Sequence, residues 1–392
     1  MLVVGAGPAG AELARLLALA GVDVVLVDRL DDLRQAAFSS AALPLDAVER
    51  YGLPPQVVAA RWSGWQLVGP GDQRRHWTAA RPLGAVLDFG ALRQCLADQA
   101  LGWGARLQLG VTALGWQMEP SGTCITWVRD DSGVRGAIRS RWVVDASGEG
   151  RALIGEPPCQ DDPLVTGLGV EWLLQVSPEV YAAWADRLSF FLGSHWVQQG
   201  YGWVFPMAPG QLKVGVCRLQ DQGRDQRPLG QELGALLQRS GLEEALVLDR
   251  HGGRIRSTVR RREQHRQGPL IGLGDAVSTA NLLGGEGIRH ALASARVLAP
   301  LLLQALASPQ GTVQLDRYPA LLRRELGWRW SLSGRLARRT WLGLAGERGD
   351  CRLERLLRGL QTTTAEDLSA LLFHYRFERY GLKALPYLLG WR

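Results

Sequence analysis

The first 28 residues constrain the fold most, because they place a glycine-rich turn between a short apolar strand and a helix. Residues 1–10 read MLVVGAGPAG, and residues 22–28, after an apolar helical stretch, read VDVVLVD. The spacing of Gly5, Gly7 and Gly10 is typical of a tight turn, a close approach of backbone to pyrophosphate, and close packing of helix on strand. The segment therefore predicts a strand–turn–helix–strand unit that binds a dinucleotide.

The helix start and the end of the second strand complete this unit. A helix that begins near Pro8 and Ala9 directs unpaired N–H groups and a positive dipole end at phosphates. Asp28 ends the second strand, where an acid accepts hydrogen bonds from ribose hydroxyls, and Arg29 follows it. We expect all four residues to contribute to the cofactor site.

Two later segments favour FAD over NAD as the dinucleotide. Residues 141–148 read RWVVDASG, an apolar strand that ends in small residues. Residues 270–276 read LIGLGDA, and residues 281–288 read NLLGGEGI before a helix to about residue 306. A second glycine-rich helix start suits a long cofactor that is held at both ends. The cofactor-binding residues expected in these segments are Ala146, Ser147, Gly148, Gly274, Asp275, Gly285, Gly287 and Ile288.

Composition and charge exclude several other classes of protein. With 46% apolar and 21% charged residues among 392, the chain is an ordinary globular sequence and not disordered, collagen-like or a coiled coil. The formal net charge of +7 is local: residues 317–358 hold eleven Arg and four acids, 11 − 4 = +7. No nucleic-acid-binding motif accompanies these arginines, so we expect no nucleic-acid partner.

Cysteines, histidines and apolar runs indicate a cytoplasmic protein without metal. The five Cys are far apart, and neither they nor the six His form a metal-ligand pattern. We therefore expect no metal site, no disulfide framework and a reducing compartment. The longest apolar run, residues 297–307, is interrupted by Pro300 and Gln304, so we expect no membrane span.

Several motifs together resemble a known flavoprotein group. Residues 5–10 (GAGPAG), 145–148 (DASG) and 274–276 (GDA) resemble the superfamily of para-hydroxybenzoate hydroxylase. Within it, residues 200–206 (GYGWVFP) and 285–288 (GEGI) are similar to the geranylgeranyl reductase family. The resemblance extends from residue 1 to about residue 345. It implies an α/β fold: a Rossmann-like FAD-binding domain, an inserted antiparallel β-sheet substrate domain and a helical C-terminal region.

The resemblance also implies roles for individual residues. Gly274 and Asp275 would meet the ribityl and pyrophosphate region of FAD. The backbone of Gly287 and Ile288 would lie at the pyrimidine edge of the ring, with a helix dipole that favours reduced, anionic flavin. Arg93 matches an arginine near the pyrophosphate; the alternative is a solvated helix residue.

The middle of the chain predicts the substrate domain. Short β-favouring runs between residues 164 and 219 indicate an antiparallel sheet. Tyr201, Trp203 and Phe205 alternate and so share one face of a strand, which Pro206 ends. The resemblance favours an apolar substrate pocket beside the flavin at these four residues, with Tyr201 as a tentative catalytic residue. The alternative is that the aromatic stripe is sheet core.

We expect three units along the chain. Residues 1–150 and 265–310 form a discontinuous FAD-binding domain, residues 151–264 the substrate sheet and residues 311–392 the helical region. In the last of these, an apolar stripe at helical spacing runs from residue 322 to residue 344, with arginines on the other side. Either this basic helix contacts an anionic membrane as a peripheral surface, or it packs on its own protein.

The resemblance leaves three flavin reactions open. The first is reduction of C=C bonds of an isoprenoid by hydride transfer from reduced FAD, with NAD(P)H or ferredoxin as electron donor. The second is hydroxylation by a class A flavin monooxygenase, and the third is a lycopene-cyclase-like reaction without net redox change. One departure concerns the substrate side: residues 38–44 read FSSAALP where many geranylgeranyl reductases have a Cys-Gly-Gly stretch.

Overall fold

A six-stranded sheet, built from strands between residues 2 and 272, holds the glycine-rich turn. The structure is a computed structural model that describes the chain except residues 36–37, 158–160, 222, 224, 309–310 and 379–392. The sheet order is β18-β19-β12-β1-β2-β8, parallel apart from the edge strand β18. Its bounds are β1 Leu2–Val4, β2 Val25–Val27, β8 Arg106–Gln108, β12 Val143–Asp145, β18 Arg266–Gln267 and β19 Leu270–Gly272.

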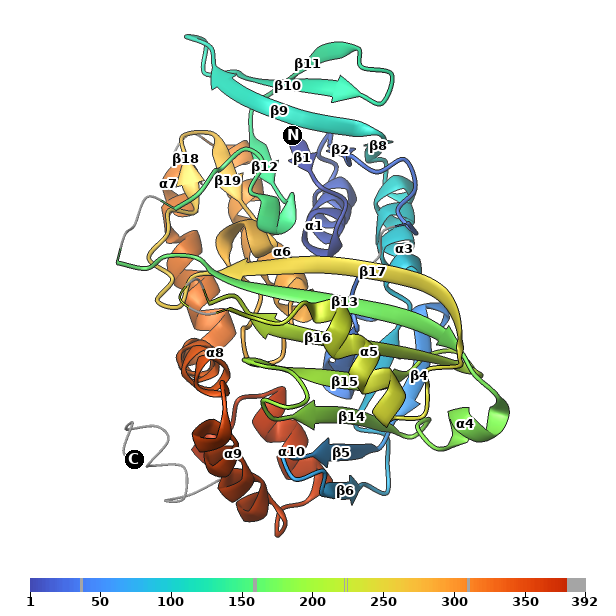
Figure 1. Cartoon of the computed structure of the whole chain (residues 1–392). Coiled ribbons are helices and arrows are strands. Elements are labelled where there is room, and N and C mark those ends of the chain that lie inside the picture. Colours follow the sequence, from blue (N-terminus) through green and yellow to red (C-terminus); the bar gives the residue numbers. More distant parts are fainter. Residues whose placement is uncertain (36–37, 158–160, 222, 224, 309–310, 379–392) are drawn as a thin grey trace.

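Helices α1 (Pro8–Leu19), α3 (Phe89–Gly102) and α6 (Ile288–Ala307) cover this sheet (Figure 1). Strands β1, β2 and β12 are buried on both faces, and their valines and leucines form one core with the apolar sides of the helices. This is the pattern expected of parallel strands with both faces covered. Here α1 packs on both α3 and α6, and Ala113 and Cys124 from the later strands of residues 111–140 join the same core. The predicted Rossmann-like fold class is confirmed.

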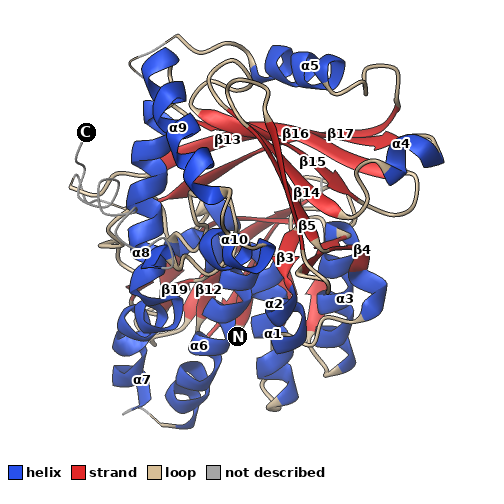
Figure 2. Ribbon diagram, turned by 90° about the horizontal axis from the view of Figure 1, so that it is seen from below, coloured by secondary structure: helices blue, strands red, loops and turns tan. Residues whose placement is uncertain are grey.

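A seven-stranded sheet forms the second layer of the molecule (Figure 1). Its order is β17-β13-β16-β15-β14-β5-β6, antiparallel except for the β14–β5 pair. Its bounds are β5 Gly64–Val68, β6 Arg74–Thr78, β13 Val165–Gln175, β14 Arg187–Leu192, β15 Gly200–Pro206, β16 Gln211–Leu219 and β17 Leu246–Ser257. Helix α5 (Leu229–Arg239) covers one face, and the C-terminal helices lie on the other side (Figure 2).

The strand pairing departs from the predicted domain boundaries. Strands β5 and β6 come from residues 64–78, which we placed in the FAD-binding domain, yet they pair with β14. Sequence patterns within one segment do not reveal such pairing, because the partner strand lies more than 100 residues away. Two small antiparallel sheets also form within residues 42–140: β3 (Ala42–Pro44), β4 (Val58–Trp62) and β7 (Gly84–Leu87), and β9 (Val111–Met118), β10 (Cys124–Asp130) and β11 (Arg135–Ser140).

Helices make up the C-terminal region as far as it is described. They are α7 (Gly311–Gln314), α8 (Tyr318–Gly343), α9 (Glu347–Leu360) and α10 (Ala365–Leu372); two further short helices, α2 (Leu45–Arg50) and α4 (Pro178–Ala182), lie earlier. Helix α8 is kinked at Gly327, whose φ of 79° is not helical. Residues 379–392 of the predicted region lie outside the described residues.

The predicted apolar stripe of α8 faces the protein interior. Leu322, Trp330, Ala337, Trp341 and Leu344 are all less than 10% exposed. The two interpretations of this helix are contact with a membrane and packing on its own protein. The burial of the apolar side supports packing on the protein for that side.

Helix α6 is long and apolar enough to cross a membrane by length and composition alone. Despite Pro300, an 18-residue window of this 20-residue helix has a mean hydropathy of 1.3. However, 61% of that window is buried inside the protein, where α6 packs on α1 and α8. By these contacts α6 is the central helix of the core.

Buried His265 makes the fold sensitive to acid. It is 2% exposed, neither ring nitrogen has a hydrogen-bond partner among the described residues, and burial, helped by the charge of Arg261, lowers the pKa of His265 to about 3. In the unfolded chain the imidazole of His265 binds a proton near pH 6.5, whereas in the folded chain it stays neutral down to about pH 3. The free energy of unfolding is therefore unaffected by His265 above pH 6.5 and falls as the pH decreases from 6.5 towards 3.

We predict that His265→Leu flattens the acid limb of stability. Between pH 6 and 4 the free energy of unfolding should fall less steeply than in the wild type, by about 1.4 kcal/mol per pH unit. Urea unfolding at a series of pH values measures this slope. Gln117→Leu, which introduces the same side chain at an exposed position without removing a titratable group, is the control and should keep the wild-type slope. Equal slopes in wild type and His265→Leu would contradict the prediction.

Candidate flavin and substrate site

The turn after β1 is built by close backbone contacts that only glycine permits. Gly5 has a φ of +106°, and a Cβ there would lie 2.3 Å from the carbonyl oxygen of Ala146. A Cβ on Gly10 would lie 1.9 Å from the carbonyl oxygen of Gly5. The first turn of α1 therefore rests directly on the ends of β1 and β12.

The same turn leaves open space where a ligand phosphate would bind. A Cβ on Gly7 or Gly148 would meet no protein atom within 4 Å. Gly7 is the N-cap of α1 and supplies no side-chain cap, and Pro8 follows as the first helical residue. Free N–H groups at a helix start beside empty space are the chemistry that a pyrophosphate requires. The residues of this turn thus fit the dinucleotide that the sequence predicts.

Asp28 and Arg93 lie together at the end of β2. The Asp28 carboxylate accepts hydrogen bonds from the backbone N–H of Ala6 at 2.7 Å and of Leu30 at 2.9 Å. A guanidinium nitrogen of Arg93 lies 4.0 Å from Asp28. Arg93 is buried, so the alternative of a solvated helix residue is wrong, whereas Arg29 is exposed.

Asp145, which the sequence analysis did not select, shapes the third segment of the site. Its buried carboxylate accepts hydrogen bonds from the N–H and hydroxyl of Ser147 and from the N–H groups of Leu153 and Ile154. These bonds reverse the chain after β12. They hold Ala146 and Ser147 beside the glycine-rich turn.

The glycine-rich segment after β19 approaches the same place from the other side. Gly274 has a φ of +62°, and a Cβ there would lie 2.8 Å from the Ala9 side chain at the start of α1. The Asp275 carboxylate accepts a hydrogen bond from the Thr279 hydroxyl at 2.7 Å. A Cβ on Gly287 would lie 3.4 Å from Asp275, which places this acid beside the start of α6 at Ile288.

The C-terminal helices fix the turn of residues 281–287. The Asn281 amide donates a hydrogen bond to the Ser333 hydroxyl at 2.6 Å. The Trp341 indole N–H points at the carbonyl oxygens of Leu282 and Leu283 at 3.2 and 3.1 Å. Sequence analysis missed these contacts, because the partners lie in helix α8, some 50 residues further along the chain.

The aromatic stripe of β15 is buried between the sheet and the C-terminal helices. Tyr201, Trp203 and Phe205 are at most 7% exposed, and Pro206 is the last residue of the strand. The Tyr201 ring lies 5.1 Å from the Trp341 ring, and its hydroxyl would lie 3.8 Å from a Cβ on Gly285. The stripe is therefore buried in an apolar cluster with Trp341 and Leu282, and the Tyr201 hydroxyl is the part of it nearest to Gly285 in the turn expected to hold the flavin.

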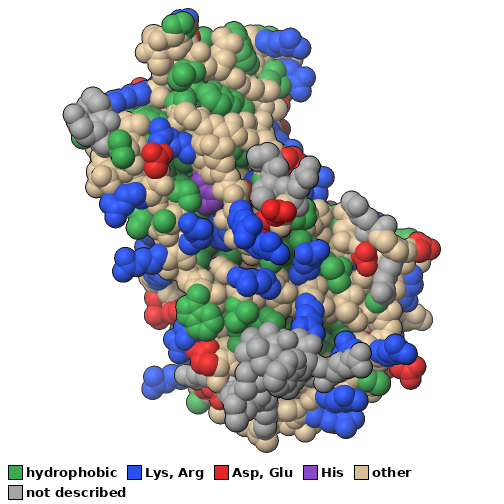
Figure 3. All heavy atoms as spheres, turned by 90° about the vertical axis from the view of Figure 1, so that its left-hand side faces the viewer, with side chains coloured by type: hydrophobic (Ala, Val, Ile, Leu, Met, Phe, Trp, Pro, Cys, Tyr) green, Lys and Arg blue, Asp and Glu red, His purple; other side chains and the backbone are tan. Residues whose placement is uncertain are grey.

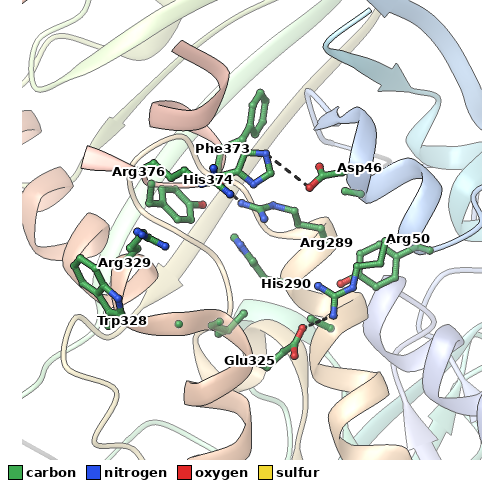
Figure 4. A pocket seen from close by; sticks show the side chains of 16 residues that line it. Asp46, Arg50, Arg289, His290, Glu325, Trp328, Arg329, Phe373, His374 and Arg376 are labelled. Atoms are coloured by element: carbon green, nitrogen blue, oxygen red, sulfur yellow. Dashed lines mark hydrogen bonds and ion pairs between the residues drawn. The ribbon is translucent and has the colours of Figure 1, made fainter. Parts of the chain in front are cut away.

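A cavity of about 270 Å³ lies beside the start of α6, at Arg289 and His290 (Figure 4). The side chains around it come from α2, the start of α6, the kink of α8 and residues 373–376. The Tyr375 hydroxyl donates a hydrogen bond to Glu286 at 2.8 Å, and Glu286 also pairs with Arg289. Burial lowers the pKa of His290 to about 3, so this ring is neutral at physiological pH.

Comparisons with known proteins agree with this geometry. A family model described as an FAD binding domain matches residues 1–42. The chain is 27% identical to a digeranylgeranylglycerophospholipid reductase of Haloferax volcanii over 79% of this chain and 77% of that protein. It is also 27% identical to a menaquinone reductase of Mycolicibacterium smegmatis, over 86% of this chain and 83% of that one.

Solved structures show the same fold at lower identity. A geranylgeranyl bacteriochlorophyll reductase-like protein of Thermoplasma acidophilum matches with a TM-score of 0.83 and 20% identity over 100% of this chain and 98% of that one. A p-nitrophenol 4-monooxygenase of Pseudomonas putida matches with a TM-score of 0.70 and 18% identity over 95% and 97%. The predicted resemblance to the geranylgeranyl reductases and the predicted cofactor FAD are confirmed.

We predict that Gly10→Ala abolishes stable FAD binding, because the added Cβ would collide with the Gly5 carbonyl and force α1 off the sheet. Overpacking of this kind costs about 1–3 kcal/mol of stability. The ratio of bound FAD to protein after gel filtration measures the effect. Gly234→Ala in α5, where a Cβ meets no atom within 4 Å, is the matched control. Full FAD occupancy in Gly10→Ala would contradict the prediction.

Proposed function

We propose that this chain, an FAD-dependent oxidoreductase similar to the geranylgeranyl reductases, reduces carbon–carbon double bonds of an apolar isoprenoid. The observation that carries the proposal is the aromatic stripe Tyr201–Trp203–Phe205, because the Tyr201 hydroxyl would lie 3.8 Å from a Cβ on Gly285 in the turn expected to hold the flavin. An apolar face beside that turn suits an isoprenoid chain and offers few partners to a polar substrate. The names of both similar reductases refer to substrates with isoprenoid chains, which supports this choice.

The cofactor-binding residues of the proposal come from four segments. Bound FAD, once reduced, supplies a hydride. Within this chain, Gly5, Gly7, Pro8, Ala9 and Gly10 would hold the pyrophosphate at the start of α1, with Asp28, Arg29 and Arg93 at the ribose and pyrophosphate. The other expected contacts are Ala146, Ser147, Gly148, Gly274, Asp275, Gly285, Gly287 and Ile288. We propose NAD(P)H or ferredoxin as electron donor, since the sequence holds no second strand–GxGxxG–helix unit.

We also propose Tyr201 as a residue that lines the substrate site, and the role of its hydroxyl can be tested. Burial raises the pKa of its hydroxyl well above the usual value, so Tyr201 keeps its proton at neutral pH. Its ring packs on Trp341, and its hydroxyl lies beside the Cys217 thiol. These contacts suit a residue that lines the substrate site and orients the substrate.

The main alternative function is that of a flavin monooxygenase, which shares the fold. One assay distinguishes it from a reductase. We predict that the anaerobically reduced protein converts an isoprenoid alkene to a product heavier by two hydrogens. Mass spectrometry of the product, with geranylgeranyl diphosphate and menaquinone as probes, measures this. Formation of a hydroxylated product that requires O2 would overturn the reductase proposal.

We predict that Tyr201→Phe keeps bound FAD and lowers the rate of alkene reduction by less than about tenfold, the effect of losing an orienting hydroxyl rather than a general acid. Stopped-flow measurement of flavin reoxidation by the alkene gives the rate. Tyr181→Phe, near the far end of β15 where the hydroxyl bonds to Met207, is the control. A loss of more than 100-fold would make Tyr201 the proton donor.

We further propose that the arginine side of α8 contacts anionic membrane surfaces. A cavity of about 380 Å³ at this side of α8 is lined by four arginines and two aspartates, with apolar Leu342 among them: Arg260, Arg335, Arg338, Arg339, Asp161 and Asp162. Figure 3 shows basic side chains spread over the face of the molecule that carries α7 to α9. Because the apolar side of α8 is buried, the attraction would be electrostatic and weakened by salt.

We predict that Arg335→Gln with Arg338→Gln weakens binding to vesicles containing phosphatidylserine roughly 30-fold, at about 1 kcal/mol per arginine. Flotation at low and physiological salt measures binding. The double variant Arg129→Gln/Arg135→Gln, on the distant β10–β11 hairpin, is the charge-matched control. Absence of wild-type flotation at low salt would contradict membrane contact.

A further inference from the structure

A buried acid and a buried lysine interrupt the aromatic face of the seven-stranded sheet. Glu171 in β13 is 1% exposed and Lys213 in β16 is 6% exposed. Gly215 in β16 pairs with Glu171 in β13 on one side and with Trp203 in β15 on the other. Lys213 in β16 pairs with Phe205 in β15. Residues paired in this way share one face, so both charged groups belong to the face that bears the aromatic stripe.

Glu171 is held by the stripe itself. The Trp203 indole N–H donates a hydrogen bond to a Glu171 oxygen at 3.0 Å. The indole reaches across β16 because the intervening residue is glycine: a Cβ on Gly215 would lie 2.2 Å from the Trp203 ring. The absence of a side chain at Gly215 thus leaves room for the Trp203 indole to reach the buried carboxyl group of Glu171.

Lys213 contacts a segment from the nucleotide-binding side of the molecule. Its ammonium donates a hydrogen bond to the backbone carbonyl of Ser39 at 2.6 Å. The neighbouring Phe38 ring lies against Gly253 and Gly169, where Cβ atoms would come within 2.4 and 3.1 Å of it. The face that holds Glu171 is therefore bounded by the segment after β2 at one place and by the turn of Gly285, next to Tyr201, at another.

The residue type at position 213 is itself informative. Lys213 and Lys383 are the only lysines among the 45 basic residues of the chain. Arginine stays protonated in proteins, whereas a buried lysine can release its proton. Burial lowers the pKa of Lys213 and raises the pKa of Glu171, while the opposite charge of each partner counteracts the shift. Burial thus favours the uncharged form of each group, which for Glu171 is the protonated acid.

Other titratable groups also face this pair. His251 lies opposite Glu171 in β17 and its ring nitrogen is 3.0 Å from Asp249. Asp88 acts on Lys213 from the start of α3, and Tyr201 and Cys217 lie further along the sheet towards the flavin turn. Of these groups, Lys213 and His251 act directly on the charge of Glu171.

We propose that Glu171, held by the Trp203 hydrogen bond on the sheet face that it shares with Lys213, is the proton donor of the reduction, an inference that rests on the proposed function. The alkene gains a hydride, with both electrons, at one carbon. The O–H bond of Glu171 breaks, and its proton forms the new C–H bond at the neighbouring carbon. The carboxylate that remains is stabilised by the Trp203 hydrogen bond and the Lys213 charge until it regains a proton from water.

The test compares two buried glutamates in single-turnover kinetics. Glu171→Gln keeps an oxygen that can accept from Trp203 but has no acidic proton. Reduced protein is mixed anaerobically with geranylgeranyl diphosphate, and flavin reoxidation is followed by stopped flow. We expect a loss of roughly 100-fold or more in Glu171→Gln, the usual contribution of a general acid, with bound FAD and thermal unfolding midpoint unchanged. Glu232→Gln is the control, because Glu232 is equally buried but lies on α5, on the other face of the sheet.

A pH profile separates proton donation from a merely structural role. The wild-type rate should fall as pH rises through the raised pKa of Glu171, because only the protonated acid can donate. Lys213→Met removes the cation that lowers the pKa of Glu171, so this limb should move to higher pH. Glu171→Gln should have no such limb. Infrared spectra should show a weaker carbonyl stretch of protonated carboxylic acid in Glu171→Gln than in wild type.

Each contrary outcome has a distinct meaning. A wild-type rate in Glu171→Gln overturns the assignment of Glu171 and leaves the reductase function standing. A loss confined to Tyr201→Phe assigns the proton to Tyr201 instead. A limb that does not move in Lys213→Met overturns the role of the lysine. If the wild-type flavin is reoxidised neither by geranylgeranyl diphosphate nor by menaquinone, the proposed function itself is wrong, and the proton donor with it.

Discussion

The contact of α1 with the ends of β1 and β12 is the constraint on which the rest of the structure depends. Gly10 brings the helix within van der Waals contact of the Gly5 carbonyl, and Gly5 does the same for Ala146. This contact places the helix start, with its free N–H groups, at the carboxyl ends of the parallel strands. A side chain at either glycine would separate helix from sheet and displace the expected phosphate site.

The second constraint is that the flavin turn is held from outside the nucleotide-binding fold. Asn281, the backbone of residues 282–283 and Glu286 are bound by Ser333, Trp341 and Tyr375 of the C-terminal region. The helical region is thus part of the site's support, and α8 buries its apolar side to provide it. The arginines of α8 are left on the outer side, where they determine the charge of that face.

The seven-stranded sheet combines apolar bulk with a few polar groups. Its aromatic stripe suits an isoprenoid chain, while Glu171 and Lys213 supply acid–base capacity in the same face. Buried charges of this kind are costly unless they are paired, and strongly shifted pKa values beside an expected cofactor commonly mark function. The two properties together are what an enzyme needs to place a hydride and a proton on neighbouring carbons.

The sequence by itself determined the features that depend on local spacing: the glycine-rich turn, the α/β class, the antiparallel sheet and the one-sided stripe of residues 201–205. Each follows from the period of a helix or strand, or from the space that a glycine leaves. Only the tertiary structure decided which distant segments meet. It paired β5 with β14, buried Arg93 beside Asp28, and turned the apolar side of α8 inward. These contacts join residues far apart in the chain, and no local pattern encodes the partner.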